Sequence, residues 1–401
     1  MSSGTAWDQS LRQEARSRFD RLGLPSRKNE AWHYTDLSQL DLAAYGLAEP
    51  MPAVIADPVA LHLRNGFLCG VPPLPDGVTL ERLEASAAGQ ALVGRLLPVD
   101  DRPVIALNAG LFTDAMVLRV AAGARVRAPV NILWESLADE GAVQFHQRLL
   151  VLLEQDAHLT LVETQRGQGP SFSTRVAEFQ LAPAAVLQHV LVQDDSLDAV
   201  HLGSSAVVLA ENSAYHGTLL QLGGRLARHE LHALLDGSGA LLSQRGATVA
   251  LGRQHLDNTT RLVHRAPSCQ SRQLFKTVLG DHGHGVFQGS VLVERSAQKT
   301  NAHQLSRALM LSDRAAMDNK PELEIYADDV KCGHGATIGD IDRQQLFYLQ
   351  ARGIDAPRAR QLLIEAFLAE VLDPVTDPSL RRHLTALISA RVSGLGAEAA
   401  A

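Results

Sequence analysis

The chain has 401 residues, of which 46% are hydrophobic, 20% are charged and 4% are aromatic, and its formal net charge is −7. This composition is typical of a folded globular protein and excludes a disordered chain. The negative charge argues against broad binding to nucleic acid or to anionic membranes, which requires concentrated Lys and Arg.

The targeting and redox signals of the chain indicate a reduced, cytoplasmic protein. The N-terminus lacks the basic and then apolar order of a signal peptide, and no apolar run approaches the roughly 20 residues that span a bilayer. The cysteines are odd in number and widely spaced, at Cys69, Cys269 and Cys332. This spacing does not predict a disulfide framework.

The first hundred residues predict one helix followed by irregular chain. Apolar residues recur every four positions, as one stripe on a helix, at Trp7, Leu11, Ala15 and Phe19. The sequence GLP at 23–25 is expected to end this helix. A stretch rich in Pro, Gly and Ala follows, so residues 1–100 are predicted to form an N-terminal helical and irregular domain.

Residues 101–342 carry the pattern of short strands without intervening helices. Runs of apolar or alternating residues are separated by Gly, Asn, Asp and Ser at fairly regular intervals. Such a long stretch exceeds a normal sandwich, whereas a β-solenoid buries the inward face of each coil against the next. No strict hexapeptide or nonapeptide repeat is visible, so the coils must be irregular. A large sandwich or barrel is the alternative.

Helical periodicity returns in residues 343–401. The first predicted helix carries Leu346 and Leu349, and the second begins near Pro357, which suits a first turn. The apolar stripe of the second helix is predicted to consist of Leu362, Leu363, Ala366, Phe367 and Val371. The stripe of a last helix is predicted to consist of Leu380, Leu384, Leu387 and Ile388. The pattern predicts a small C-terminal helical domain.

The densest polar cluster lies just before this domain, in the sequence ELEIYADDVKCGHGAT. A corner or a bulge is expected at Asp328–Asp329, after which Cys332 and His334 share one face of a strand. Same-face neighbours lie roughly 6.5–7 Å apart, so a thiolate and an imidazole could converge on one iron or zinc ion. Alternatively, Cys332 is a buried structural thiol and His334 a satisfied core group. Two ligands do not complete a tetrahedral site, so a metal here would need a second subunit.

Two other histidine segments are weaker candidates. The sequence DHGHG at 281–285 has the residues of a metal tract, but its glycines equally predict a turn with exposed imidazoles. His255 and Asp257 lie on one strand face, either as an acid–base pair or as a polar ladder on a solvated strand. The chain contains no phosphate loop, nucleophile elbow or HExxH sequence. These observations favour a scaffold over an enzyme.

Several separated segments between about residues 100 and 372 resemble the SufB/SufD family, the core subunits of the SUF iron–sulfur cluster assembly machine. The matching segments include IALNAGLFTDA, GGRLARHEL, QKTNAHQ, KPELEIYADDVKCGHGATIGDID, LFYLQARGI and ARQLLIEAF. The sequence NEAWHYTDL and the KC-x-HGAT sequence resemble the SufD branch in particular. One departure is Gly333, where the family commonly has Ser, on the face opposite the Cys332 and His334 pair.

The resemblance implies a mainly β fold, with a right-handed parallel β-helix core flanked by N-terminal and C-terminal helical domains. It implies that the β-helix pairs with that of a SufB-like subunit, and that the C-terminal helical domain docks a SufC-like ABC ATPase. We expect partner contacts in that domain from Phe347, Tyr348, Arg352 and Phe367. In isolation the chain could form a homodimer.

The resemblance also implies a function, that of a non-catalytic scaffold which helps to form the cluster-building site at the SufB–SufD interface. His334 falls at the position of the family's proposed site histidine and is the expected metal ligand, with Cys332 as the second candidate. Both would contact a transient iron–sulfur cluster shared with the partner, and no cofactor is expected to stay bound to this chain alone. The alternatives are a stand-alone β-helix enzyme acting on polysaccharide and a homodimeric SufB-like scaffold.

Overall fold

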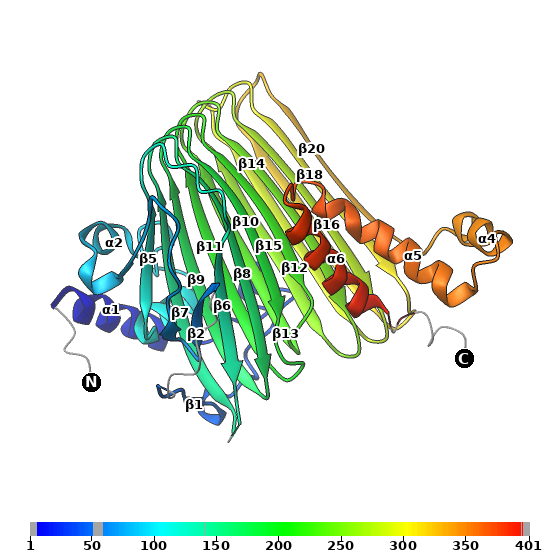
Figure 1. The fold of residues 1–401 in the computed structure, drawn as a ribbon, viewed down its shortest axis with the longest axis horizontal. Helices are drawn as coiled ribbons and strands as arrows, with labels where there is room; N and C mark the ends of the chain where they lie inside the picture. Colours follow the sequence, from blue (N-terminus) through cyan, green and yellow to red (C-terminus); the bar gives the residue numbers. More distant parts are fainter. Residues whose placement is uncertain (1–5, 51–58, 140, 394, 396–401) are drawn as a thin grey trace.

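The computed structural model describes residues 6–50, 59–139, 141–393 and 395. Residues 115–339 form a β-solenoid of about eight turns, with helices before and after it, which confirms the predicted fold class. Each turn contributes one strand to each of two sheets, and the strands stack along the length of the molecule (Figure 1).

Sheet 1 contains the odd-numbered strands of the solenoid. In spatial order its strands are β4 (Val78–Arg82), β5 (Ala115–Val120), β7 (Val143–Leu153), β9 (Ser171–Leu181), β11 (Val200–Leu209), β13 (Leu226–Leu235), β15 (His255–His264), β17 (His284–Val293) and β19 (Ala316–Ile325). The two-residue strand β1 (Gly46–Leu47) also pairs with β7.

Sheet 2 contains the even-numbered strands of the solenoid, preceded by β2 and β3. In spatial order its strands are β3 (Phe67–Gly70), β2 (Ala60–Arg64), β6 (Val130–Leu137), β8 (His158–Gln168), β10 (Val186–Asp194), β12 (Ala214–Gln221), β14 (Leu241–Ala250), β16 (Gln270–Leu279), β18 (Asn301–Met310) and β20 (Lys331–Gly339). The strands β2, β3 and β4 come from residues that we expected in the N-terminal domain, because pairing with the first coils satisfies their backbone.

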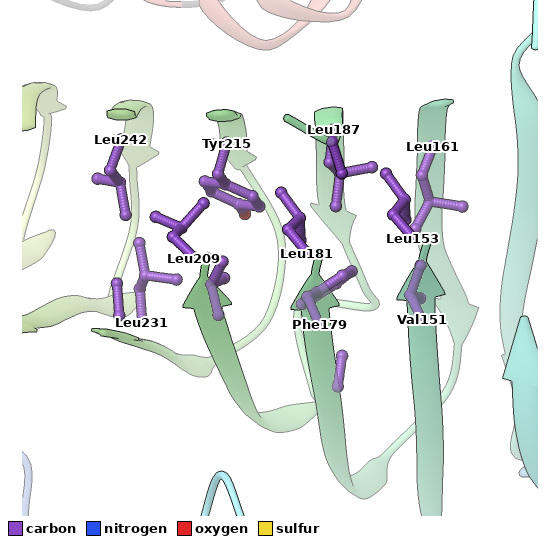
Figure 2. Packing of buried hydrophobic residues seen from close by; sticks show 14 of the residues in the cluster. Val151, Leu153, Leu161, Phe179, Leu181, Leu187, Leu209, Tyr215, Leu231 and Leu242 are labelled. Atoms are coloured by element: carbon purple, nitrogen blue, oxygen red, sulfur yellow. The ribbon is translucent and has the colours of Figure 1, made fainter. Parts of the chain in front are cut away.

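Parallel, in-register pairing places equivalent residues of successive coils in columns. Leu153, Leu181 and Leu209 form one such column on the inner face of sheet 1 (Figure 2). Leu187, Tyr215 and Leu242 form a facing column on sheet 2. All six side chains are buried. Because the two sheets face each other along the whole stack, aliphatic side chains fill the space between these columns, so a chain with few aromatic residues can form this core.

A corner from sheet 1 to sheet 2 recurs once per coil. In the five middle corners, from β7–β8 to β15–β16, one residue adopts a left-handed backbone, at Asp156 (φ +57°), Ala184 (φ +58°), Asn212 (φ +54°), Gly239 (φ +71°) and Ser268 (φ +59°). Its N–H donates to a carbonyl of the next coil, as Ala184 does to Glu211 at 2.9 Å. These positions are spaced 28, 28, 27 and 29 residues apart. The repeat is thus one whole coil, which explains why no short repeat is visible.

Two matched substitutions test the contribution of this corner. Gly239→Ala is expected to lower the free energy of unfolding by about 1–2 kcal/mol, because a Cβ disfavours the left-handed backbone and would crowd the side chain of Asn212. Ala184→Gly in the equivalent corner is expected to have the opposite sign, with a gain below about 1 kcal/mol because Gly also loses entropy on folding. Urea-unfolding midpoints measure both, and equal signs would contradict the expectation.

Helices cover the outer faces of both sheets. The helices are α1 (Ala6–Leu22), α2 (Ala87–Leu92), α3 (Pro103–Leu111), α4 (Arg343–Ala351), α5 (Ala356–Ala369) and α6 (Pro378–Val392). The short 3-10 segments are η1 (Glu30–Trp32), η2 (Leu42–Ala44), η3 (Leu83–Ala85) and η4 (Glu370–Leu372). The first predicted helix is confirmed. It ends at Leu22, and Gly23, with φ +66°, follows it.

Helix α3 lies on the outer face of β7 and β9, and α1 packs on α3. Asn108 of α3 donates to the carbonyl of Gln147 at 2.9 Å. Beside it, the buried Arg148 and Glu178 side chains form an ion pair at 3.0 Å. Because buried polar groups require partners, these contacts fix where α3 sits on the sheet.

The three C-terminal helices are confirmed, but α5 and α6 have no core of their own. They pack on the outer face of sheet 2, where Ile364, Leu368 and Val371 bury against strand residues such as Val192 and Val249. The predicted stripe on α5 was partly wrong, because Ala366 is exposed and Ile364 is buried. This helix has apolar residues on two sides, and contact with the sheet decides which side is covered.

Candidate functional site

The candidate site lies at the last coil of the solenoid, where β19 and β20 form the outer edges of the two sheets. In the described chain β20 pairs only with β18, and β19 pairs only with β17. Ala327 is buried at the corner between them, beside Asp328 and Asp329. The predicted corner therefore turns the chain from β19 into β20 and sets the inward face of β20.

Cys332 sits on this inward face and is half-buried. Its register partner is Ala302, which is fully buried, and the thiol packs against the hydrophobic core beside Val330. Burial raises the pKa of Cys332, and the N–H of Ala302 offsets this effect in part. The thiol is therefore held in the form that binds metal poorly, and a ligand role would require a nearby cation to deprotonate it.

His334 is exposed although it shares the inward face with Cys332. It ends a column of buried glutamines in register with it, formed by Gln244, Gln273 and Gln304. Each glutamine of this column is covered by the coil that follows its own strand. In the described chain no coil follows β20. His334 is exposed for this reason, and its imidazole is accessible at the open end of the β-helix.

The pair does not form a complete metal site within the described part of the chain. No group of three or more His, Cys, Asp and Glu side chains is positioned there to hold a metal ion. Residues 281–283 form the predicted turn, with Asp281 at φ +52° and His282 exposed, whereas His284 begins β17, is half-buried and lies 2.7 Å from Asp318. An ion held by Cys332 or His334 would therefore need further ligands from elsewhere.

Apolar side chains surround this open end. Ile325, Tyr326 and Ile338 are 42%, 57% and 52% exposed. Ile325 and Ile338 lie on the two edge strands and Tyr326 directly follows β19. The outer backbone groups of both strands have no partner strand among the described residues. Exposed apolar side chains on unpaired edges are typical of a surface that another chain covers.

Helix α4 projects beyond the open end and contacts α5 (Figure 1). Asp342 caps its N-terminus, accepting from the N–H of Gln344 at 2.8 Å. Phe347 and Tyr348 are 71% and 59% exposed. Arg352 lies over the Tyr348 ring, 5.2 Å from its centroid. The structure thus brings Phe347 and Tyr348 of α4 together with Arg352, which directly follows the helix.

The fourth predicted contact residue, Phe367, lies elsewhere. It is half-buried on α5 and packs against the outer face of sheet 2. The ammonium of Lys276 in β16 lies 4.5 Å from the centre of its ring. This position gives Phe367 a role in holding α5 on the β-helix.

The chain matches two family models. Residues 136–367 match the SufBD core domain of the SUF system for FeS cluster assembly, and residues 5–80 match the SufBD protein N-terminal region. The core match alone spans more than half of the chain. The protein belongs to the SufBD family.

Curated relatives of this SufBD protein align over most of its length. An iron–sulfur cluster assembly SufBD family protein of Synechocystis is 33% identical over 95% of this chain and 90% of its own. The iron–sulfur cluster assembly protein SufD of Escherichia coli is 32% identical over 93% of this chain and 90% of its own. SufD of Bacillus subtilis is 27% identical over 73% of this chain and 68% of its own. None of the described helices is long and apolar enough to cross a membrane.

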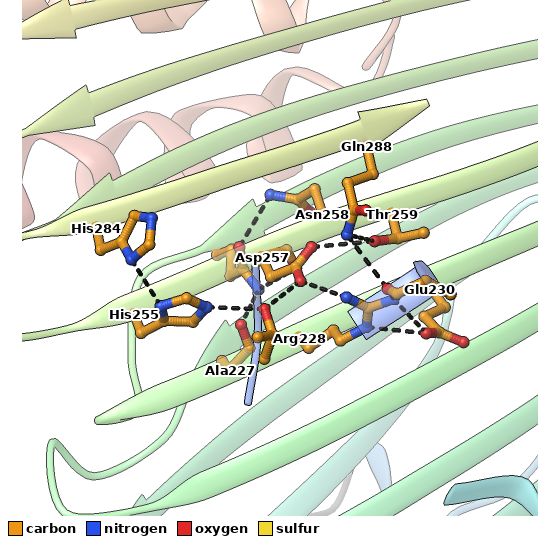
Figure 3. Close-up of polar contacts among 12 residues, drawn as sticks. Ala227, Arg228, Glu230, His255, Asp257, Asn258, Thr259, His284 and Gln288 are labelled. Atoms are coloured by element: carbon orange, nitrogen blue, oxygen red, sulfur yellow. Dashed lines mark hydrogen bonds and ion pairs between the residues drawn. The ribbon is translucent and has the colours of Figure 1, made fainter. Parts of the chain in front are cut away.

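In this SufBD protein, His255 and Asp257 are neither a solvated ladder nor an acid–base pair open to substrate. The N-terminal segment around NEAWHYTDL covers them, and Asp257 is fully buried. Thr35 donates to Asp257 at 2.5 Å and lies 2.8 Å from the Nε2 of His255. His255 Nδ1 lies 3.0 Å from His284 Nδ1 (Figure 3). Burial lowers the pKa of His255 to about 4, so it is neutral at pH 7.

Arg228 anchors the same N-terminal segment from β13. It pairs with Asp257 and, at 2.7 Å, with Glu230 (Figure 3). Its Nη2 donates to the carbonyl of Ala31 at 2.7 Å, and its guanidinium lies 4.1 Å from the centre of the Trp32 ring. Residues of the NEAWHYTDL sequence thus contact a buried polar cluster on β13 and β15. Strand periodicity could not predict this contact.

Thr35→Val is expected to loosen this segment. The substitution leaves Asp257 and His255 each short of a buried partner, which costs about 1–3 kcal/mol. We expect faster amide hydrogen exchange over residues 30–37 and altered fluorescence of Trp32. Thr385→Val in α6 is the matched control, since that hydroxyl is exposed. Unchanged exchange at 30–37 in Thr35→Val would contradict the docking role.

A second cluster missed by the sequence reasoning lies inside the β-helix. Glu163 and Arg175 form a fully buried ion pair between the two sheets. His189 lies 2.8 Å from Glu163, and the indole of Trp134 donates to Glu163 at 2.7 Å. Burial alone would raise the pKa of Glu163, but Arg175 and His189 lower it to about 2. Charged residues within otherwise apolar strands are the one signal that could have indicated this cluster.

Proposed function

We propose that this protein is the SufD-like scaffold subunit of a SUF complex, in which it completes an iron–sulfur assembly site with a SufB-like partner. One observation carries the proposal. The last coil ends in two unpaired edge strands with exposed apolar side chains, and it presents His334 next to Cys332 on the inward face. Pairing of such an end with the end of another solenoid would bury the apolar surface and satisfy the free backbone groups.

The chemistry of the pair suits iron and sulfide as cargo. An imidazole nitrogen is a good ligand for iron, and a thiol becomes one after deprotonation. A positive ion bound between the two paired solenoid ends would lower the pKa of Cys332, which burial raises in the isolated chain. The pair supplies two ligands at most, so the partner would supply the others. This arrangement favours a transient cluster over a resident one.

The exposed aromatic pair on α4 supports docking of a SufC-like ABC ATPase at the C-terminal helices. Since α5 packs on sheet 2, movement of a docked ATPase would be transmitted to the β-helix next to the open end. Coupling of this kind requires two arrangements that nucleotide binding favours unequally. In this scheme the chain itself is non-catalytic and acts in the cytoplasm.

A co-expression pull-down with SufB-like and SufC-like subunits tests the proposal. We expect His334→Ala to leave the complex intact, because the side chain is exposed and carries no described hydrogen bond. Anaerobically bound iron and sulfide are expected to fall at least tenfold. His303→Ala is the matched control, since His303 is exposed on the adjacent strand but faces outward.

The outcome separates the proposal from its rivals. An intact complex with unchanged iron and sulfide in His334→Ala would contradict the site. A homodimer that excludes the SufB-like subunit would favour a homodimeric scaffold, with the open ends of two copies paired. A chain that cleaves polysaccharide without partners would favour the stand-alone enzyme.

A further inference from the structure

A basic hollow lies on the outer face of sheet 1, far along the chain from the Cys332 and His334 pair. It has a volume of about 300 Å³ and lies between residues 95–102 and strands β11, β13 and β15. Every titratable side chain that lines it is basic: Arg95, Arg102, His232, Arg261 and Arg265. This is unexpected in a chain with a net charge of −7.

Three of the four arginines, Arg95, Arg102 and Arg261, have no carboxylate partner among the described residues. Arg265 pairs with Asp236 at 3.0 Å and with Glu294 at 3.6 Å. Arg102 and Arg261 form no ion pair with the part of the chain that the structure describes. Moreover, the Nη1 of Arg102 is buried there without a hydrogen-bond acceptor. A buried guanidinium nitrogen without an acceptor is costly, and an anion bound in the hollow would supply that acceptor.

The rest of the lining is apolar. Val208, Leu234 and Val263 form one outward column on three adjacent strands, and Leu96 lies opposite. The hollow therefore offers a cationic edge and an apolar floor. Its volume is at the lower end of the range of small-molecule sites.

The adjoining larger hollow differs in character. It has a volume of about 570 Å³ and shares Arg102, His232 and Arg261 with the basic one. Its other titratable side chains include the carboxylates of Glu230, Glu322 and Glu324. A negatively charged ligand would thus be drawn to the basic side, away from these carboxylates.

We propose that the basic hollow binds a small organic anion, of the phosphate-ester or polycarboxylate class, with its charged groups on Arg102 and Arg261. The planar guanidinium fork matches both phosphate and carboxylate oxygens. The apolar part of the ligand would lie over Val208, Leu234 and Val263. The site is independent of the assembly site proposed above, because no residue is shared.

Calorimetric titration of the full chain at low salt tests the proposal with three probes: AMP, citrate and adenosine. We expect AMP or citrate to bind and the uncharged adenosine to bind at least tenfold more weakly. Tighter binding of AMP would indicate the phosphate-ester class, and tighter binding of citrate the polycarboxylate class. Arg261→Ala, at an exposed position, is expected to weaken binding of the anion at least tenfold. Arg102→Ala is expected to have the same effect.

Arg314→Ala is the matched control, because it removes one exposed arginine outside the hollow. Its affinity for the anion is expected to stay within twofold of the unsubstituted chain. The proposal is overturned if neither anion binds, if adenosine binds as tightly as AMP, or if Arg314→Ala weakens binding as much as Arg261→Ala. The assay uses the isolated chain, so failure here leaves the pull-down result for the assembly site unaffected.

Discussion

Replacing Phe347 and Tyr348 together by Asp is expected to weaken binding of the SufC-like ATPase at least about a hundredfold. The two rings are among the most exposed large hydrophobic side chains of the described chain, and they lie on a helix that projects beyond the β-helix. Aromatic side chains of this kind typically carry much of the binding energy of an interface. Two carboxylates in their place would be desolvated without a partner on binding.

The double substitution is a cleaner test than truncation before Asp342. Truncation would also remove α5 and α6, which cover the outer apolar face of sheet 2. The exposed face would then promote aggregation and obscure any loss of binding. Leu197→Asp is the matched control, because Leu197 is 56% exposed at a corner of the solenoid outside α4.

Binding can be measured by calorimetry with the purified ATPase. We expect Leu197→Asp to bind as the unsubstituted chain does. Full affinity in the Phe347→Asp, Tyr348→Asp variant would remove α4 from the docking surface. Equal loss in both variants would indicate a general effect of added charge.

Glu163→Gln is expected to lower the free energy of unfolding by about 3–5 kcal/mol, because it leaves the charge of Arg175 buried without its counter-ion. Both side chains are fully buried, and the Glu163 carboxylate also receives the indole N–H of Trp134 and contacts His189. Glu294→Gln is the matched control, since Glu294 pairs with Arg265 on the exposed surface. An exposed pair of this kind contributes about 0–1 kcal/mol.

Urea unfolding at neutral pH measures both variants. A Glu163→Gln variant as stable as Glu294→Gln would show that the buried pair contributes no more than an exposed one. The double substitution Glu163→Gln, Arg175→Met is expected to recover part of the loss, because it removes the unpaired charge. If the double substitution recovers no stability, the loss in Glu163→Gln is caused by packing and not by the unpaired charge.

The same carboxylate predicts how stability depends on pH. The pKa of Glu163 is about 2 in the folded chain, below its ordinary value of 4.5. A depressed pKa contributes stability that is present above pH 4.5 and is lost as the pH falls toward 2. The Glu163→Gln variant should therefore lose less stability than the parent chain between pH 4.5 and 2. If the stability of the variant and of the parent chain falls in parallel over this pH range, the depressed pKa of Glu163 is contradicted.

Much of the fold follows from local patterns. Strand runs separated by turn residues favoured a solenoid over a sandwich or barrel, and apolar stripes at helical spacing predicted the terminal helices. The position of Cys332 and His334 on one strand face follows from the two-residue period of a strand. Each of these features depends on residues close together in the chain.

The boundaries and the buried faces of the helices could not be predicted in the same way. Ile364 rather than Ala366 is buried on α5, because the helix packs on sheet 2 and not on other helices. Residues 60–82 join the sheets because the first coil offers them backbone partners. Both outcomes depend on which surface is nearby in the folded chain.

The sequence by itself determined that this chain stacks short strands and carries a thiol and an imidazole side by side near its last strand. Only the tertiary structure decided that His334 is exposed and Cys332 half-buried, because in the described chain no coil follows β20 to cover them and only Cys332 packs against the core. It also decided that His255 and Asp257 are covered by Thr35, about 220 residues away in sequence. Burial and charge pairing are properties of contacts between distant segments, and local periodicity contains no record of them.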